Sequence, residues 1–293
     1  MCNNVIKSVC WDITSKCNDS CAFCYRNKCT SDLRVDDNMT ILKKLIDADI
    51  EKISFVGGEP LLYEQICKLI EYGKKYSNNK VLFSITTNGI LFTDCEDDNI
   101  VIKENFLSRI LQHIDWITFS LDAPNSETQI MMGRNDRHFE RISALIKFIG
   151  DRYPKKKIKI NTVVTKINYT YMNEMYRLLL NYGISRWKLF RFLPSRGDAL
   201  KNKDKYYITE NEFNDVVNSL ISRSDNKQIR ITINDYSQFD NSYVTISSSG
   251  ELVVYQNGTY HTRLNLLSDS FEETYKYIDI EKHNINRSDF KMV

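Results

Sequence analysis

The stretch Cys17-Asn18-Asp19-Ser20-Cys21-Ala22-Phe23-Cys24-Tyr25 places three cysteines at C-x3-C-x2-C spacing, with an aromatic residue directly after the last cysteine. Thiolates ligate iron in iron–sulfur clusters, and three neighbouring thiolates can hold three corners of a 4Fe–4S cube. The fourth iron then lacks a protein ligand, and an open metal position indicates chemistry because structural metal sites are normally closed. The spacing therefore predicts a 4Fe–4S cluster ligated by Cys17, Cys21 and Cys24.

Two alternatives to this cluster are three unrelated thiols and part of a zinc site. A zinc site requires a fourth ligand and usually contains pairs at C-x2-C and H-x3-H spacing, and the chain has no second pair of that kind. The other cysteines are scattered: Cys2, Cys10, Cys29, Cys67 and Cys95. Secreted disulfide scaffolds are short and rich in cysteine, so scattered thiols in 293 residues predict a reducing, cytoplasmic location. We interpret Cys29, although it lies near the motif, as a bystander.

Composition excludes several classes of partner. The formal net charge is +2, so there is no basic excess that would indicate a stable nucleic-acid partner or a membrane surface. No apolar run approaches the roughly 18 residues that a membrane-spanning helix needs, and the first residues lack the apolar stretch of a secretory signal. We therefore expect one sizeable domain of a soluble protein without a membrane partner.

Strand-like and helix-like segments alternate through the first two thirds of the chain. β-rich runs bounded by turn residues predict parallel strands, and apolar residues at helical spacing predict the helices between them. The expected strands are 8–13, 52–56, 81–86, 116–121, 158–164 and 186–192, and the expected helices are 39–49, 63–76, 100–113, 139–150 and 171–182. Six such units predict an α/β fold, a partial (β/α)6 barrel of the TIM type.

The pattern changes after Pro194. We expect a helix over 210–222, capped by Thr209, and strands over 229–233, 243–247 and 252–255, with a hairpin turn at 248–250 between the last two. Segments 93–99 and 201–205 are polar and charged and are expected to be loops, and the tail from 268 is weakly patterned. The prediction is a barrel over residues 1–194 and a C-terminal α+β extension over 195–293 that packs on the barrel or closes it.

Side-chain alternation along the strands predicts a polar barrel interior. On each strand the apolar residues should meet the helices, which leaves the others in the lumen: Ser84, Thr86 and Asn88; Thr118, Ser120 and Asp122; Lys159, Asn161 and Val163; Arg186 and Lys188. A closed barrel that is only a scaffold is filled by branched apolar residues. Because unpaired buried polar groups cost several kcal/mol, we expect the lumen to bind a large polar ligand.

The cysteine motif and three later motifs resemble the radical S-adenosylmethionine (SAM) superfamily. These later motifs are Gly57-Gly58-Glu59-Pro60 after the second strand, Thr87-Asn88-Gly89 after the third, and Ser120-Leu121-Asp122 after the fourth. Met132-Gly133-Arg134 is similar to a further element whose arginine pairs with the SAM carboxylate. The resemblance implies a six-unit partial barrel in which SAM binds the open iron and is cleaved to a 5′-deoxyadenosyl radical. It implies SAM-binding roles for Gly57, Gly58, Glu59, Asn88, Ser120, Asp122 and Arg134.

Two other stretches resemble the viperin family and its prokaryotic relatives. They are Lys159-Ile160-Asn161-Thr162-Val163 and Arg186-Trp187-Lys188-Leu189-Phe190, and Asn18 also fits. The resemblance implies removal of water from a ribonucleoside triphosphate to give the 3′-deoxy-3′,4′-didehydro nucleotide, with a role in antiviral defence. It implies Mg²⁺ with the triphosphate and an electron donor such as flavodoxin or ferredoxin. The residues implied to hold the substrate are Asn18, Lys159, Asn161, Arg186 and Lys188.

The chain departs from the viperin pattern after the third cysteine, where Tyr25-Arg26-Asn27 stands. A radical SAM enzyme that modifies a peptide or another small molecule therefore stays as an alternative. No cysteine follows Cys95, which argues against relatives that carry auxiliary clusters in a C-terminal extension. A non-catalytic iron–sulfur protein is disfavoured because the SAM motifs are intact. The sequence identifies no catalytic side chain and no base preference.

Overall fold

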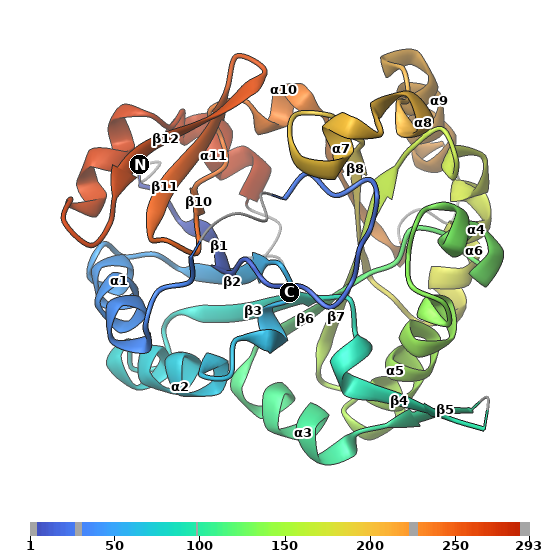
Figure 1. Cartoon of the computed structure of the whole chain (residues 1–293), viewed down its shortest axis with the longest axis horizontal. Helices are drawn as coiled ribbons and strands as arrows, with labels where there is room; N and C mark the ends of the chain where they lie inside the picture. The colour runs from blue at the N-terminus through green and yellow to red at the C-terminus, as the bar shows by residue number, and fades with distance from the viewer. Residues whose placement is uncertain (1–4, 27–30, 98, 223–227, 288–293) are drawn as a thin grey trace.

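The computed structural model describes residues 5–26, 31–97, 99–222 and 228–287, so Cys2 and Cys29 lie outside the described residues. Its main sheet has ten strands in the order β12-β11-β10-β1-β2-β3-β6-β7-β8-β9. Neighbouring strands from β10 to β9 all run parallel. The strands are β1 Ser8–Thr14, β2 Lys52–Gly57, β3 Leu82–Thr87, β6 Trp116–Ser120, β7 Lys157–Val164, β8 Arg186–Arg191, β9 Arg230–Asn234, β10 Thr245–Ile246, β11 Glu251–Gln256 and β12 Thr259–Asn265. This parallel sheet curves into the predicted partial barrel (Figure 1).

Helices cover the outside of the curved sheet (Figure 1). They are α1 Val35–Asp47, α2 Ile66–Tyr76, α3 Glu104–His113, α5 His138–Arg152 and α6 Met172–Asn181. In α1 the apolar residues Ile41, Leu42 and Leu45 recur at helical spacing, and all three are fully buried in the core. None of the helices in the described ranges is long and apolar enough to cross a membrane.

All six predicted strands and the five helices between them are confirmed, with ends that shift by a few residues. The extension contributes two more strands to the same parallel sheet, because β9 pairs with β8 at one edge and β10 pairs with β1 at the other. Tyr243, just before β10, reaches the opposite edge: its hydroxyl accepts from Lys188 Nζ at 2.9 Å and from the Asn234 amide. The division of the chain at residue 194 stays a prediction.

Several local details confirm the expected chemistry of the extension. Thr209 caps α9 (Glu210–Ile221) in a capping box with Glu212, which satisfies two backbone donors at the helix start. The antiparallel hairpin of β10 and β11 turns at Gly250, whose φ of +81° is a conformation that glycine adopts without strain.

Two expectations for the loops were wrong. Segment 93–99, expected as a loop, contains β4 (Thr93–Glu96), which pairs with β5 (Asn99–Ile102) in a separate hairpin, so helix α3 starts at Glu104 and not at residue 100. Segment 201–205 lies in two short helices, α7 (Gly197–Lys201) and α8 (Lys203–Tyr206). The weakly patterned tail from 268, for which we predicted no element, contains helix α11 (Ile280–Arg287). These segments are short and mostly polar, so contacts with the rest of the fold decide their structure more than apolar periodicity does.

Candidate active site

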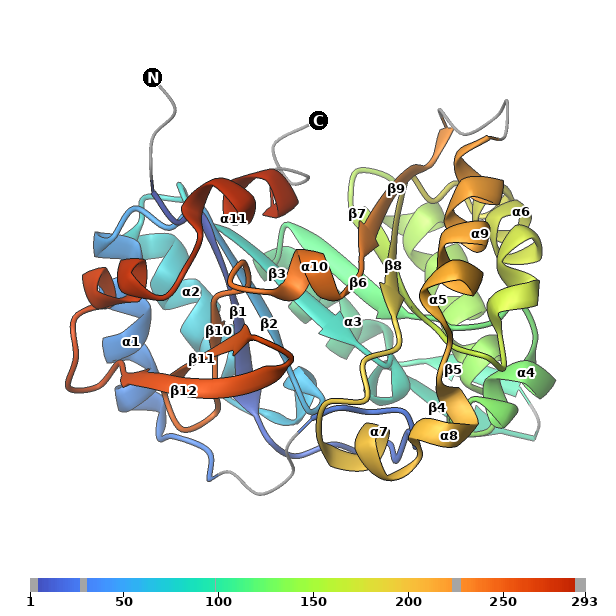
Figure 2. The ribbon, with the colours of Figure 1, turned by 90° about the horizontal axis from the view of Figure 1, so that it is seen from above.

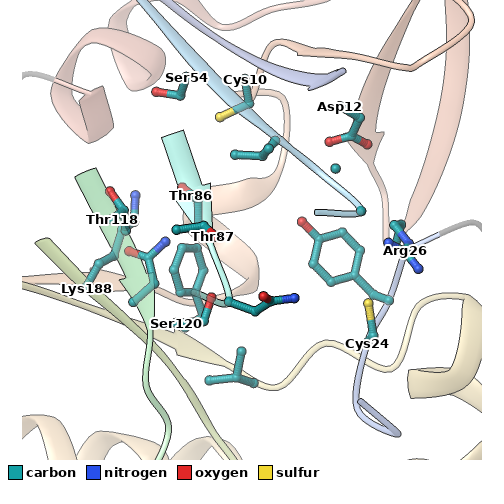
Figure 3. A pocket seen from close by; sticks show the side chains of 18 of the residues that line it. Cys10, Asp12, Cys24, Arg26, Ser54, Thr86, Thr87, Thr118, Ser120 and Lys188 are labelled. Carbon is teal, nitrogen blue, oxygen red and sulfur yellow. The ribbon is translucent and has the colours of Figure 1, made fainter. Parts of the chain in front are cut away.

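A cavity of about 310 Å³ opens inside the barrel toward the carboxyl ends of its strands. It is lined by side chains from every strand between β1 and β8 of the main sheet, by the cysteine loop, and by the segment before β10. Figure 3 shows Lys188 and Thr118 on one wall, with Asp12, Arg26 and Cys24 across the open space. The polar side chains predicted for β3, β6 and β7 therefore line the cavity together with apolar ones, and the three motif cysteines lie at its mouth.

Cys17, Cys21 and Cys24 all line this cavity as free thiols. The Cys24 amide donates to the Cys21 carbonyl at 3.1 Å, and the Cys21 thiol donates to the Asp19 carboxylate at 3.1 Å. Burial raises the pKa of the Cys21 thiol, although the nearby Arg134 guanidinium opposes the rise. In the described ranges no three His, Cys, Asp or Glu side chains are close enough together to hold an ion as they stand. Three thiols on one short loop at a cavity mouth nevertheless fit a three-cysteine cluster, and its loading has to replace the Cys21–Asp19 hydrogen bond.

The paired glycines after β2 bring that strand against the start of the cysteine loop. The Gly58 and Glu59 amides donate to the carbonyls of Thr14 and Lys16, each at 2.8 Å. A Cβ at Gly58 would lie 1.7 Å from the Lys16 carbonyl oxygen, and a Cβ at Gly57 would lie 2.6 Å from that of Thr14. Glycine is required at both positions because the two backbones touch.

Glu59 connects two of the motifs. Its buried carboxylate accepts from the Thr87 hydroxyl at 2.7 Å, from the Asn88 amide at 2.8 Å and from the Leu61 amide at 3.2 Å. Burial raises the pKa of Glu59 to about 7, and the hydrogen bonds from Asn88, Thr87 and Leu61 oppose the rise. Glu59 therefore fixes the ends of β2 and β3 relative to each other.

Asp122 and Arg134 form a buried pair beside the cysteine loop. The Arg134 guanidinium donates to Asp122 Oδ2 from Nε at 2.8 Å and from Nη2 at 2.7 Å, and it reaches Asp19 at 3.6 Å and Cys21 Sγ at 3.2 Å. Burial alone would lower the pKa of Arg134, but the negative charges of Asp122 and Asp19 raise it above its ordinary value. The pair thus joins the end of β6 to the cluster loop.

Asn88 and Ser120 line the cavity, as predicted, but Asn18 is not among the lining residues. Asn18 Oδ1 accepts from Asn88 Nδ2 at 2.8 Å, and that amide nitrogen lies 4.0 Å from Cys17 Sγ. The structure therefore groups Asn18 with the cysteine loop and not with the lysines on β7 and β8.

Lys159, Asn161 and Lys188 line the wall formed by β7 and β8. Lys188 is 4% exposed, and its ammonium group bonds to the Tyr243 hydroxyl. The Asn161 side-chain oxygen is buried and has no hydrogen-bond partner among the described residues. A buried acceptor without a partner costs about 1–3 kcal/mol, so this oxygen can accept a hydrogen bond from a water molecule or a ligand in the cavity.

Arg186 does not line the cavity. It lies on the same strand face as Lys188, two residues nearer the amino end of β8, with its guanidinium carbon 5.0 Å from the ring centroid of Trp116. Lys52 and Lys157 lie over the same ring, at 5.8 and 5.2 Å. Our placement of Arg186 in the lumen beside Lys188 needs this correction: strand alternation gives the face of the sheet but not the depth within the barrel.

Asp12 is a lining residue that sequence reasoning missed. Burial raises the pKa of its carboxyl group to about 6, although Arg196 and Arg26 oppose the rise. Strand alternation applied to 8–13 would have placed Ser8, Cys10 and Asp12 on one face, and all three line the cavity.

A partial parallel barrel with a three-cysteine loop over an internal cavity defines a class of cluster-dependent barrel enzymes. The model of the radical SAM superfamily matches residues 11–185. An S-adenosylmethionine-dependent nucleotide dehydratase from Flammeovirga pacifica is 33% identical over 94% of this chain and 91% of its own length. The protein of that name with the suffix RSAD2 from Oncorhynchus mykiss is 27% identical over 73% of this chain and 62% of its own length.

Solved structures share the fold at low identity. SuiB of Streptococcus suis bound to S-adenosylmethionine has a TM-score of 0.68 at 17% identity, over 97% of this chain and 68% of that chain. Native anSMEcpe with AdoMet and the Kp18Cys peptide has a TM-score of 0.69 at 17% identity, over 98% and 84%. The chain belongs to the radical SAM superfamily and, within it, to the family of these nucleotide dehydratases, so a 4Fe–4S cluster and SAM are its implied cofactors.

Proposed function

We propose that this protein removes water from a ribonucleoside triphosphate to give the 3′-deoxy-3′,4′-didehydro nucleotide. The observation that carries the proposal is the wall of Lys159, Asn161 and Lys188 inside a cavity whose mouth holds the cysteines. Two ammonium groups and an unpartnered amide oxygen suit an anionic ligand that also offers donors. The family to which the chain belongs supplies the reaction class.

The roles of the chain's own residues follow from their contacts. Cys17, Cys21 and Cys24 are proposed to hold the cluster, which together with bound SAM would supply the radical chemistry, namely removal of a hydrogen atom from the substrate. The SAM-positioning group is proposed to comprise Gly57, Gly58, Glu59, Asn88, Ser120, Asp122 and Arg134. Within it, Glu59 and the Asp122–Arg134 pair hold the strand ends and the loop in place, since their polar atoms are bonded to those elements.

The substrate is proposed to lie against β7 and β8. Lys159 and Lys188 bind its phosphates, and Asn161 accepts a hydrogen bond from it. Arg186, which lies over Trp116 and does not line the cavity, has no part in this proposal. Asn18 would act through Asn88 at the cysteine loop. Positioning and exclusion of water are the protein's part in such a reaction, because the cofactor carries the difficult chemistry.

The finer parts of the proposal are a Mg²⁺ ion that accompanies the triphosphate, a protein electron donor such as flavodoxin or ferredoxin, a cytoplasmic location and a role in antiviral defence. The barrel over residues 1–194 and the extension over 195–293 are proposed as the two parts of the chain. Support for the extension's role in the site comes from Tyr243, which lies beyond residue 194 and contacts Lys188.

The test is anaerobic reconstitution with iron, sulfide, SAM and dithionite, followed by each of the four ribonucleoside triphosphates. We expect 5′-deoxyadenosine to form with at least one triphosphate, together with a nucleotide product lighter by one water. No nucleotide-dependent turnover with any triphosphate would contradict the proposal and would favour a peptide or another small molecule as substrate.

A further inference from the structure

The segment 196–207 supports the cysteine loop from outside the barrel. The Ala199 amide donates to the Cys24 carbonyl at 2.9 Å, and the Asn202 side-chain amide donates to the Ala22 carbonyl at 3.0 Å. Arg196 Nε donates to the Tyr25 carbonyl at 3.0 Å. Figure 2 shows α7 and α8 beside this loop, on the side of the molecule opposite to helix α11. One hydrogen bond therefore joins a predicted cluster ligand to a surface helix.

The outer face of this segment combines apolar and basic side chains. Leu200, next to Ala199, is 50% exposed, and Tyr207 is 43% exposed. Helix α4 (Ser126–Met131) ends beside it, because the Tyr206 hydroxyl donates to the Met132 carbonyl at 3.2 Å. That helix exposes two further apolar side chains, Ile130 and Met131. We define the helical patch as Ile130, Met131, Leu200, Lys201, Lys203, Lys205 and Tyr207, all of them exposed.

The charge of this region is positive. Between residues 197 and 207 the exposed charged side chains are Lys201, Lys203 and Lys205 against one carboxylate, Asp204, whereas Arg196 lines the cavity. The exposed side chains of this segment thus have an excess of two positive charges. Exposed apolar residues with a basic rim are complementary to a protein partner with an acidic surface.

We propose that the helical patch docks an acidic one-electron carrier protein that reduces the cluster. In the step, one electron leaves the reduced centre of the carrier and enters the cluster, and no atom is transferred. Docking at the patch brings the carrier onto the segment that is hydrogen-bonded to Cys24. The inference rests on the cluster in the cysteine loop and not on the identity of the substrate.

The main test reverses three charges of the patch in the cluster-loaded enzyme, with Lys201→Glu, Lys203→Glu and Lys205→Glu combined. The probe is a reduced acidic flavodoxin. Because steering between opposite charges raises association rates by 10-fold or more, we expect the Kd from calorimetry to rise about tenfold. Bleaching of the cluster's visible absorbance by the flavodoxin should slow by a similar factor. Bleaching by dithionite, which needs no docking surface, should stay unchanged.

A matched control reverses the charge of three exposed lysines near the amino ends of the strands: Lys75→Glu, Lys80→Glu and Lys155→Glu. It changes the net charge equally and should leave flavodoxin binding nearly unchanged at moderate ionic strength. Two substitutions that do not change the charge test the apolar residues of the helical patch. Leu200→Ser should weaken binding several-fold, whereas Ile221→Ser, on the exposed face of α9, should not.

Three results would overturn the proposal. Equal weakening by both triple variants would mean that only net charge matters, and no weakening by either would mean that the carrier docks elsewhere. Slower bleaching by dithionite in the patch variant would mean that the lysines maintain the loop itself. A failed nucleotide assay would leave these binding and bleaching results unaffected, so the two proposals can fail separately.

Discussion

The two walls of the cavity differ in the partners with which their polar side chains form hydrogen bonds and ion pairs. At the ends of β2, β3 and β6, Glu59 bonds Thr87 and Asn88, and Arg134 bonds Asp122, so the motif side chains satisfy each other. On β7 and β8, the Asn161 oxygen has no partner in the described part of the chain, and Lys188 bonds a tyrosine hydroxyl.

This difference separates two tasks. A wall whose polar groups are mutually bonded is preorganised, so it can hold a cofactor at a fixed position. A wall whose polar groups face the cavity pays a desolvation cost that a ligand can recover. The first wall therefore suits the shared cofactor, and the second suits the particular substrate. Variants on the two walls should produce different kinds of defect.

The largest effect is expected from the cysteine loop. Cys24→Ser should abolish cluster binding, because one of the three predicted iron ligands is lost. The measurement is iron and sulfide content after anaerobic reconstitution, together with 5′-deoxyadenosine formation, which should be undetectable. Cys67→Ser, on helix α2, is the control and should load and turn over normally. A fully loaded and active Cys24→Ser protein would show that the cluster is ligated elsewhere.

We call the wall at the ends of β2, β3 and β6, whose polar side chains bond one another, the bonded wall. Breaking a bond within it should lower the free energy of unfolding. Arg134→Met leaves the Asp122 carboxylate buried without its cation, and removal of one partner of a buried pair typically costs about 3–5 kcal/mol. Urea denaturation of the unloaded protein measures the loss. Arg152→Met removes an exposed pair with Glu104 and should cost less than about 1 kcal/mol. Equal losses in the two variants would mean that the wall is not held by this pair.

A substitution on the other wall, formed by β7 and β8, should weaken substrate binding without affecting the cluster. Lys188→Met keeps most of the side chain's length but removes its charge, and a charge-assisted hydrogen bond contributes about 1.5–3 kcal/mol, or roughly 10- to 100-fold in affinity. Calorimetry with a ribonucleoside triphosphate should detect this loss while cluster content stays normal. Lys155→Met, in an exposed position outside the barrel, should bind like the parent protein. Unchanged affinity in Lys188→Met would place the phosphates elsewhere.

The sequence alone predicts the barrel and the first wall well, because each motif is contiguous and follows a recognisable strand. Thr87-Asn88-Gly89, for example, stands at the end of β3, in which the apolar Phe83 and Ile85 alternate with the polar Ser84 and Thr86. The bonds between motifs could not be predicted, since Glu59 and Asn88 are far apart in sequence and meet only when β2 and β3 pair.

The sequence also does not show how deep in the barrel each side chain lies. Arg186 and Lys188 share a face, yet only Lys188 reaches the cavity, because successive residues on one face lie at different heights in the barrel. The hairpin of β4 and β5 was missed for a different reason: Thr93–Glu96 carries little apolar pattern and becomes a strand through pairing with Asn99–Ile102.

The smallest effect concerns the pH dependence of stability, and it comes from the bonded wall. The pKa of Glu59 is about 7 in the folded protein and 4.5 for the unperturbed group, so between these values the folded state binds more protons than the unfolded state. The contribution of Glu59 to the free energy of unfolding therefore falls by about 2 kcal/mol as pH rises from 5 to 7. The side chain that Glu59→Gln introduces cannot titrate. Between pH 5 and pH 7 the free energy of unfolding of this variant should therefore fall by about 2 kcal/mol less than that of the parent protein.

Denaturation of the unloaded proteins at several pH values measures the difference, and the exposed Glu127→Gln is the control that should follow the parent. Parallel profiles for the parent protein and Glu59→Gln would mean that the hydrogen bonds from Thr87, Asn88 and Leu61 keep the carboxylate ionised, so the bonded wall would hold a buried charge throughout this range.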